Sequence, residues 1–173
     1  MSSSMTILTT ERLHLKRLQT SDVLQLIDIW CDPEATRFMG GPRDRVKLEA
    51  GFADDVKDPF AERFDLWPVK EKSSGSVVGH CGLLDKEIDG KKEIELIYVF
   101  CKDAWGKGYA SEMGQALMWY AFEEMNIERL IALIEPENAA SERVAVKIGL
   151  RFEKEVIRPG GHKRKVYVVT QNE

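Results

Sequence analysis

The sequence lacks several features that would point to particular classes of protein. Its three cysteines, Cys31, Cys81 and Cys101, lie in apolar segments without CxxC spacing, so neither a disulfide framework nor a cysteine-based metal site is expected. We interpret them as reduced core residues, because free cysteine behaves as a small hydrophobe. The three histidines are scattered and form no group with metal-ligand spacing, so no metal cofactor is expected.

Long apolar runs and an excess of positive charge are also missing. No apolar run approaches the roughly 20 residues that a membrane-spanning helix needs, and residues 1–5 lack the basic start and long apolar centre of a signal peptide. A cytoplasmic protein without a membrane partner is the expectation. The 25 basic and 29 acidic residues give a formal net charge of -4, which provides no general attraction for nucleic acid.

What the chain does contain is typical of one globular domain over residues 1–173. Of its 173 residues, 43% are hydrophobic and 31% are charged. A chain of this length can bury roughly two-thirds of its unfolded surface in a single core. No repeat, low-complexity tract or domain linker interrupts it.

Hydrophobic periodicity divides the first hundred residues into strands and helices. The predicted elements are a strand over 10–18, a helix ending before Pro33, a helix within 43–58, hairpin strands over 64–70 and 76–84, and a strand over 93–101 after the Asp89-Gly90 turn. The last three strands are predicted to form an antiparallel meander.

The second part of the chain alternates helix and strand. The predicted elements are a helix from about 108, a buried strand over 129–134, a helix capped by Asn138 or Ser141 and stopped at Gly149, and strands over 151–157 and 165–170. Because a helix joins the strands at 93–101 and 129–134, these two strands should be parallel neighbours.

The turn over residues 105–110, WGKGYA, has the chemistry to hold a phosphate group. The first turn of a helix has N–H groups without intrahelical partners and a positive dipole potential. Gly106 and Gly108 leave the backbone open to an anion, and Lys107 adds a positive charge. The alternative is a strand-to-helix turn whose glycines serve only backbone geometry.

Four segments, in order along the chain, carry a family resemblance. They read TERLHLKRL at 10–18, CDPEATRFMGG at 31–41, ELIYV and then WGKGYASE between 95 and 112, and PENAASERVAVKIGLRFE at 136–153. With these motifs the chain resembles the GCN5-related N-acetyltransferase (GNAT) superfamily, and more narrowly its branch that acetylates the N-termini of ribosomal proteins. The resemblance implies an α+β fold, with a mixed, mostly antiparallel sheet of about seven strands flanked by helices. The sheet is splayed into a V that takes the pantetheine arm of acetyl-coenzyme A.

The resemblance also implies which residues bind the cofactor. The family's pyrophosphate loop falls on residues 105–110, and Trp105 stands at a position that is usually Arg or Gln. The backbone amides that would surround the two phosphates belong to Gly106, Lys107, Gly108, Tyr109, Ala110 and Ser111. The backbone of Val99 and Phe100 would contact the acetyl and pantetheine groups, and the amide of Asn138 would fix the pantetheine arm.

Acetyl transfer to an amine needs a base that accepts the amine proton, which raises the rate by about 100- to 10,000-fold. Glu95 is the predicted base, because the motif puts it at the gap and partial burial would raise its pKa; the alternative is a solvated carboxylate paired with a lysine such as Lys92. Glu93, on the same strand face, is the reserve base, whereas Tyr98 points the other way and is interpreted as core. Ser141 stands at the family's position for protonating the leaving thiolate, and its alternative role is helix capping.

One departure from the family pattern concerns the acceptor pocket. Ile97 stands where relatives often have glycine, on the Glu95 face, so a narrower or differently shaped pocket is expected. The expected activity is transfer of acetyl from acetyl-coenzyme A to a primary amine, such as a protein N-terminal α-amine, by direct attack in a ternary complex. The alternatives are an acetyltransferase for a small amine (a polyamine, drug or amino acid) and a non-catalytic coenzyme A-binding module. The sequence leaves open the acceptor and the choice between monomer and homodimer.

Overall fold

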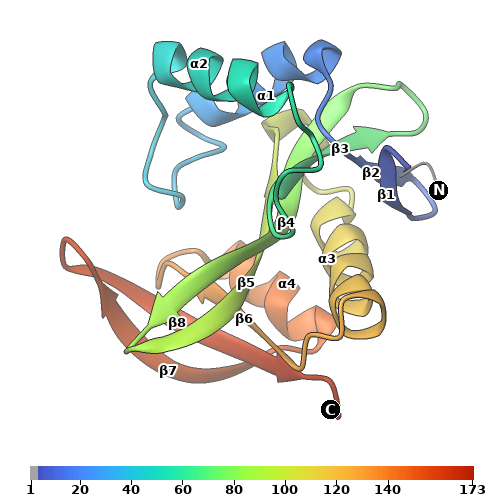
Figure 1. Ribbon diagram of the computed structural model, residues 1–173. Coiled ribbons are helices and arrows are strands. Elements are labelled where there is room, and N and C mark those ends of the chain that lie inside the picture. The colour runs from blue at the N-terminus through green and yellow to red at the C-terminus, as the bar shows by residue number, and fades with distance from the viewer. Residues whose placement is uncertain (1–3) are drawn as a thin grey trace.

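The computed structural model describes residues 4–173 and shows an eight-stranded sheet with helices on both faces (Figure 1). The strands are β1 (Thr6–Thr9), β2 (Leu13–Lys16), β3 (Leu66–Glu71), β4 (Val77–Ile88), β5 (Lys91–Phe100), β6 (Arg129–Ile134), β7 (Arg151–Arg158) and β8 (His162–Thr170). The helices are α1 (Val23–Cys31), α2 (Arg45–Asp55), α3 (Tyr109–Trp119), which continues into a π-helical turn over Tyr120–Glu124, and α4 (Ala139–Ile148). Within residues 4–173, no helix has the length and apolar character that crossing a bilayer requires. Residues 1–3, which belong to the segment where no signal peptide is expected, lie outside the described residues.

The order of the strands confirms the mixed, mostly antiparallel sheet. It runs β1-β2-β3-β4-β5-β6-β8-β7, and β5–β6 is the parallel pair in this order. The helix α3 joins these two strands, as the strand-helix-strand pattern predicts. The sheet has one strand more than the seven expected, because Thr6–Thr9 pairs with β2 at the edge. The predicted strand over 10–18 is shorter in the structure and spans Leu13–Lys16.

The sheet opens between β5 and β6. The antiparallel ladder between β4 and β5 runs along the whole of β5, from Phe100 opposite Gly79 to Lys91 opposite Ile88. On the other side of β5, the register with β6 pairs Glu95 with Ile131. Beyond Glu95, β5 and β6 do not continue as paired strands. The β5 backbone groups that face β6 there are therefore not used in a β5–β6 ladder.

Alternation along β5 sends neighbouring side chains to opposite layers of helices. Leu96 and Phe100 pack in the core that contains Met113 and Leu117 of α3. Val99 packs on the other face, in a cluster with residues of α1 and α2. Figure 1 shows α3 and α4 beside one another and α1 and α2 at the far end of the sheet. The end of β5 is thus held between two cores.

Candidate active site

A cleft of about 750 Å³ lies beside the C-terminal end of β5. Its walls come from the loop between α1 and α2, from the segment joining β5 to the first turn of α3, and from the start of α4. Nine predicted site residues line it: Val99, Phe100, Gly106, Gly108, Tyr109, Ala110, Ser111, Asn138 and Ser141. Two predicted site residues, Glu95 and Lys107, are not part of its lining.

The turn before α3 exposes its backbone to the cleft. Gly106 and Gly108 have φ angles of 78° and 81°, left-handed values that residues with a Cβ rarely adopt. Gly108 is the N-cap of α3, so the first amides of the helix have no intrahelical acceptor. These amides and the helix dipole favour a negative charge. The geometry of the turn therefore fits an anion.

The side chain of Lys107 is engaged by an acidic neighbour. Its Nζ lies 3.6 Å from Oε2 of Glu71 and 5.7 Å from the centroid of the Tyr109 ring. The Tyr109 hydroxyl donates a hydrogen bond to the same Glu71 oxygen at 2.5 Å. Glu71 therefore offsets the charge that the sequence assigns to this turn, and the backbone of Lys107 is the part that is available to an anion.

A carboxylate in the first turn of α3 fixes this turn to the N-terminal strands. Oε2 of Glu112 accepts hydrogen bonds from the Thr10 hydroxyl at 2.6 Å and from the Arg12 backbone N–H at 3.0 Å. Its Oε1 accepts a third from Arg12 Nε at 2.8 Å. Burial alone would raise the pKa of Glu112, but the bonds from Thr10 and Arg12 lower it. Two of the family-like segments, far apart in the sequence, thus hold each other in place.

Trp105 lies at the edge of the cleft and not in the hydrophobic core. Its indole Nε1–H donates to the carbonyl oxygen of Phe100 at 2.9 Å, and the side chain lines the cleft while remaining 49% exposed. The indole closes the turn back onto the end of β5. An Arg or Gln at this position would present a charged or amide group instead, so an anion here depends on backbone donors.

Asn138 caps α4 and positions Ser141. The Asn138 side-chain oxygen accepts a hydrogen bond from the Ser141 N–H at 3.1 Å, which identifies Asn138 as the N-cap. The Ser141 hydroxyl is therefore not required for capping. It lies 3.1 Å from the hydroxyl of Tyr98, which also donates to the Ser141 carbonyl at 3.0 Å.

Tyr98 is a core residue, as the sequence predicts, but it also contributes to the cleft. Its ring packs against the apolar core, but the residue lines the cleft and its hydroxyl reaches Ser141. Burial raises the pKa of Tyr98 to about 12, so the hydroxyl keeps its proton at neutral pH. Strand alternation predicts the correct face, but it cannot reveal that α4 begins over that face. A tyrosine among apolar neighbours at a strand end was the available signal.

Glu95 is buried at the point where β5 and β6 pair. The residue is 7% exposed, and its Oε1 lies 3.5 Å from Nζ of Lys86. Burial raises the pKa of Glu95, although Lys86 and a hydrogen bond from the Leu133 N–H act in the opposite direction. The lysine partner is thus Lys86 rather than Lys92, and the carboxylate is not on a solvated face.

Glu95 and the cleft are separated along β5. Val99 follows Glu95 by four residues, which corresponds to roughly 13 Å along a strand. A carboxylate at this distance is beyond direct contact and beyond a single bridging water from a group beside Val99, so proton transfer between them requires a chain of several waters. Ile97 lies between them on the same face and is partly buried.

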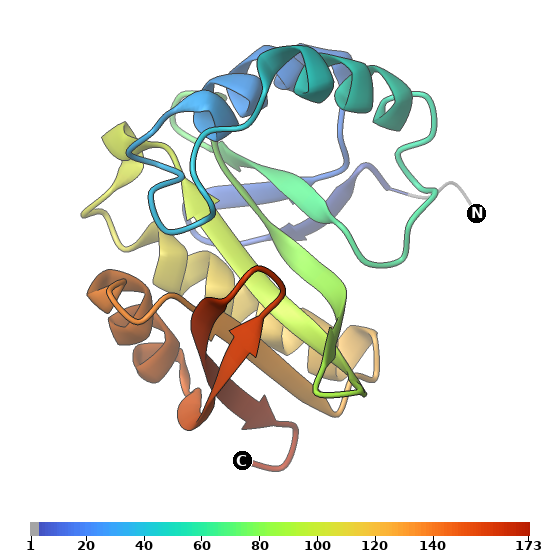
Figure 2. The same ribbon diagram turned by 90° about the vertical axis from the view of Figure 1, so that its left-hand side faces the viewer.

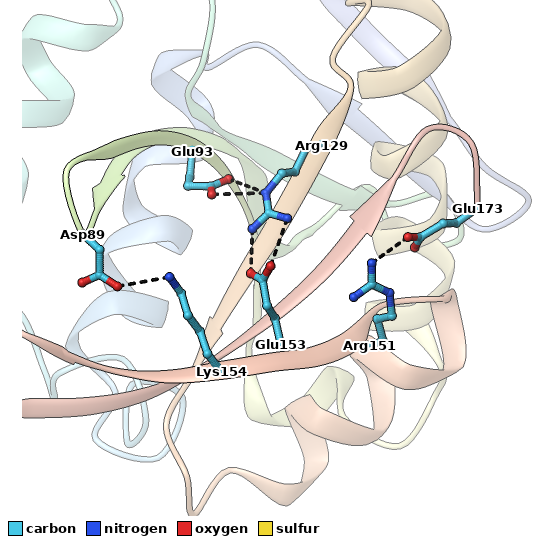
Figure 3. A network of polar contacts seen from close by, with 7 residues as sticks. All are labelled: Asp89, Glu93, Arg129, Arg151, Glu153, Lys154 and Glu173. Atoms are coloured by element: carbon cyan, nitrogen blue, oxygen red, sulfur yellow. Dashed lines mark hydrogen bonds and ion pairs between the residues drawn. The ribbon is translucent and has the colours of Figure 1, made fainter.

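Glu93 is held in an ion-pair network at the other end of β5 (Figure 3). Arg129 Nε lies 3.0 Å from Glu93 Oε2, and Arg129 Nη2 lies 2.6 Å from Glu153 Oε2. This network ties β5, β6 and β7 together. It engages the reserve base in a structural role, further from the cleft than Glu95.

His80 is a structural histidine in the core. Its Nδ1 accepts a hydrogen bond from Trp30 Nε1 at 2.9 Å, and burial lowers its pKa to about 4. Across residues 4–173, no three His, Cys, Asp or Glu side chains come together in a way that could hold a metal ion.

Comparisons with known proteins agree with this architecture. The family described as "Acetyltransferase (GNAT) domain" matches residues 12–151. The "Uncharacterized N-acetyltransferase p20" of Bacillus licheniformis is 34% identical over 155 residues, which cover 87% of this chain and 84% of that protein. A GNAT-family acetyltransferase structure from Bacillus anthracis has a TM-score of 0.80 and 27% identity, and covers 98% of this chain and 100% of that one.

A more distant structure shares the fold. The spermidine N-acetyltransferase of Vibrio cholerae, solved with CoA and spermine, has a TM-score of 0.76 at 14% identity and covers 93% of this chain and 96% of that one. At this identity the likeness concerns the fold alone. The match over most of the chain, together with the opened β5–β6 sheet and the glycine turn at α3, shows that this chain belongs to the GNAT acetyltransferase family and is an N-acetyltransferase.

Proposed function

We propose that the chain transfers the acetyl group of acetyl-coenzyme A to a primary amine, such as a protein N-terminal α-amine, by direct attack in a ternary complex. The observation that carries this proposal is the cleft at the end of β5, whose lining combines strand backbone, a glycine turn and the start of α4. Family membership supports it, and so does the CoA complex of the spermidine N-acetyltransferase.

The residues present fit coenzyme A. Gly106 and Gly108 lack the Cβ atoms that would crowd a diphosphate, and the first amides of α3 supply donors. Val99 and Phe100 lie where β5 leaves β6, so a pantetheine arm can bond to their main chain as an added strand would. The side-chain NH2 of Asn138 is left for the ligand, since its oxygen caps α4.

Chemistry at this site requires one new bond and one broken bond. The neutral amine nitrogen bonds to the thioester carbon, and the carbon–sulfur bond breaks. Glu95 accepts the amine proton through a chain of several waters, and its raised pKa makes it a stronger base than an ordinary glutamate. The Ser141 hydroxyl, held by Tyr98, donates a hydrogen bond to the departing thiolate, which then takes a proton from water. A backbone N–H at the end of β5 polarises the thioester carbonyl.

Acceptor-dependent release of the coenzyme A thiol tests the proposal. Purified protein is supplied with acetyl-coenzyme A and a panel of N-terminal peptides, polyamines, amino acids and aminoglycosides. Release that depends on one class of amine supports acetyl transfer and identifies the acceptor class. A protein that binds coenzyme A but releases no thiol with any amine would instead be a binding module.

A further inference from the structure

The sheet face that carries Glu95 also carries basic side chains from neighbouring strands. Residues directly opposite each other on antiparallel strands share a face. Leu84 lies opposite Glu95 and Lys86 lies opposite Glu93, so Lys86 is on the Glu95 face. The distance of 3.5 Å between the Lys86 ammonium and the Glu95 carboxylate agrees with this register.

The β7–β8 hairpin adds two arginines to the same face. Val156 and Val166 pack with Ile131, the β6 residue that pairs with Glu95. Alternation along β7 and β8 puts Arg158 and Arg164 on the side of these valines. Arg158 is close enough for its charge to lower the pKa of Glu95. Figure 2 shows the hairpin in front of the sheet, with its tip below the loop between α1 and α2.

These two arginines have no carboxylate partner among the described residues, unlike three other cations of the hairpin. Arg158 donates to the backbone carbonyl of Glu87 at 2.8 Å, and Arg164 donates to that of Lys163 at 2.7 Å. The paired cations of the hairpin are Arg151 with Glu173, Lys154 with Asp89 and Lys165 with Glu142, and the first two of these pairs appear in Figure 3. Arg158, near Glu95, and Arg164, on the same face, are thus cations without a paired carboxylate in a chain whose net charge is -4.

The pocket that lies on the same face nearer to α1 and α2 is not acidic. It has a volume of about 360 Å³ and lies between α1, α2 and the sheet, with Arg43 and Lys47 in its lining. Its one acidic residue is Asp44, whose Oδ1 caps α2 by accepting from the Lys47 N–H at 2.9 Å. The lining of this pocket therefore lacks the free carboxylates that would bind a polycation.

We propose that the acceptor is an amine that also carries an anionic group, and that Arg158 and Arg164 recognise this group. The proposal rests on the proposed acetyl transfer and names the class of its acceptor. Cations beside Glu95 attract a carboxylate by charge-assisted hydrogen bonds. They also disfavour an ammonium ion, so the amine loses its proton more readily before it attacks. Free acidic amino acids and peptide N-termini followed by acidic side chains share this chemistry.

A competing anchor exists for a cationic acceptor. Asp55, Glu62 and Asp65 lie near one another at the connection between α2 and β3, and Asp65 accepts from the Leu66 N–H at 2.8 Å. Leu83 donates to the Asp65 carbonyl at 3.1 Å, so this acidic group lies on the far side of β4 from Glu95. A polyamine would use it, which makes a polyamine the informative competitor.

The test compares acceptors that are matched in size and differ in charge. The kcat/KM for thiol release is measured for glutamate against glutamine, for Ala-Asp-Asp peptides against Ala-Lys-Lys peptides, and for spermidine. The variants are Arg158→Gln and Arg164→Gln, and the matched control is Lys72→Gln, in the exposed turn at the opposite end of β4. Arg164→Gln keeps the test valid if loss of the Arg158–Glu87 bond impairs folding.

We expect wild type to prefer the anionic acceptors, and each arginine variant to lower that preference by about 10-fold, the effect of one charged contact. Lys72→Gln should keep the wild-type preference. The amino acid and peptide arms then show which source supplies the anionic group. Preference for spermidine or the lysine peptide would overturn the inference while leaving acetyl transfer intact, and so would arginine variants with unchanged selectivity. Absence of release with every amine would instead refute the proposed function.

Discussion

At the level of single residues, the proposed chemistry depends on two groups that lie on opposite faces of β5. Glu95 is held close to Lys86 on one face of β5, and Tyr98 reaches Ser141 on the other. Burial shifts both pKa values upward, which favours a stronger base in one case and a retained proton in the other. In the proposed reaction Glu95 is thus the base, whereas Tyr98 keeps its proton and holds Ser141 in place for the leaving thiolate.

Replacing Glu95 by glutamine should reduce turnover at neutral pH by about 100-fold or more, because the base is lost. Wild-type activity should fall as the pH drops through the raised pKa of Glu95, at a higher pH than for an ordinary glutamate.

The stability of the fold should depend on pH in the opposite direction. A carboxyl group whose pKa is raised in the folded state stabilises the fold below its unfolded-state pKa, and this contribution is lost as the pH rises through the folded-state pKa. Glu95→Gln should therefore remain folded at neutral pH. Turnover, calorimetric affinity for coenzyme A and thermal unfolding check these points, and an unchanged pH–rate profile would remove Glu95 from the role of base.

Replacing Tyr98 by phenylalanine and Ser141 by alanine tests whether they act as one unit. Each variant should lower kcat by roughly 10-fold, a modest effect because thiolate is a fair leaving group. The double variant should be no slower than the slower single variant, since each change breaks the same hydroxyl pair. Effects that multiply in the double variant would show that the two residues act independently.

At the level of elements, the turn between β5 and α3 is built to expose its backbone to the cleft. Gly108 caps α3 with a left-handed backbone, the Lys107 side chain pairs with Glu71, and Glu112 binds the connection between β1 and β2. The helix start is therefore fixed before any ligand binds. Such preorganisation reduces the loss of conformational entropy on binding.

Replacing Gly108 by glutamate should abolish coenzyme A binding, with a loss of affinity of at least about 100-fold, because a carboxylate would face the diphosphate at the helix start. A matched control is Gly149→Ala, since Gly149 also has a positive φ, of 111°, at the end of α4, outside the cleft lining. Both changes strain the backbone by about 1–2 kcal/mol, but only the first should change affinity. Calorimetric titration decides, and normal affinity in Gly108→Glu would refute the phosphate assignment.

The sequence predicted most elements and the face of each β5 side chain, because a period of two or 3.6 is a local property. It could not predict β1, because the segment Thr6–Thr9 has only four residues, too few to show the alternation of apolar and polar residues that indicates an edge strand. It predicted Glu95 on the correct face but not its separation from the cleft lining. The location of the cleft along β5 depends on the loop between α1 and α2, which forms one of its walls and comes from a distant part of the sequence.

At the level of the whole molecule, the proposed reaction uses one sheet for both substrates. The opening beyond the Glu95–Ile131 pair leaves a cleft toward α3 and α4, and the curled β7–β8 hairpin borders the opposite face. A cofactor in the cleft and an amine on the hairpin side can therefore be bound at the same time. This arrangement favours direct transfer between them over an acetyl-enzyme.

The most direct test of this account is an initial-rate measurement of thiol release over a matrix of acetyl-coenzyme A and acceptor concentrations. We predict that double-reciprocal lines intersect, because both substrates must be bound before the amine attacks. Parallel lines, or a burst of thiol before acceptor is added, would indicate an acetyl-enzyme and would contradict direct transfer.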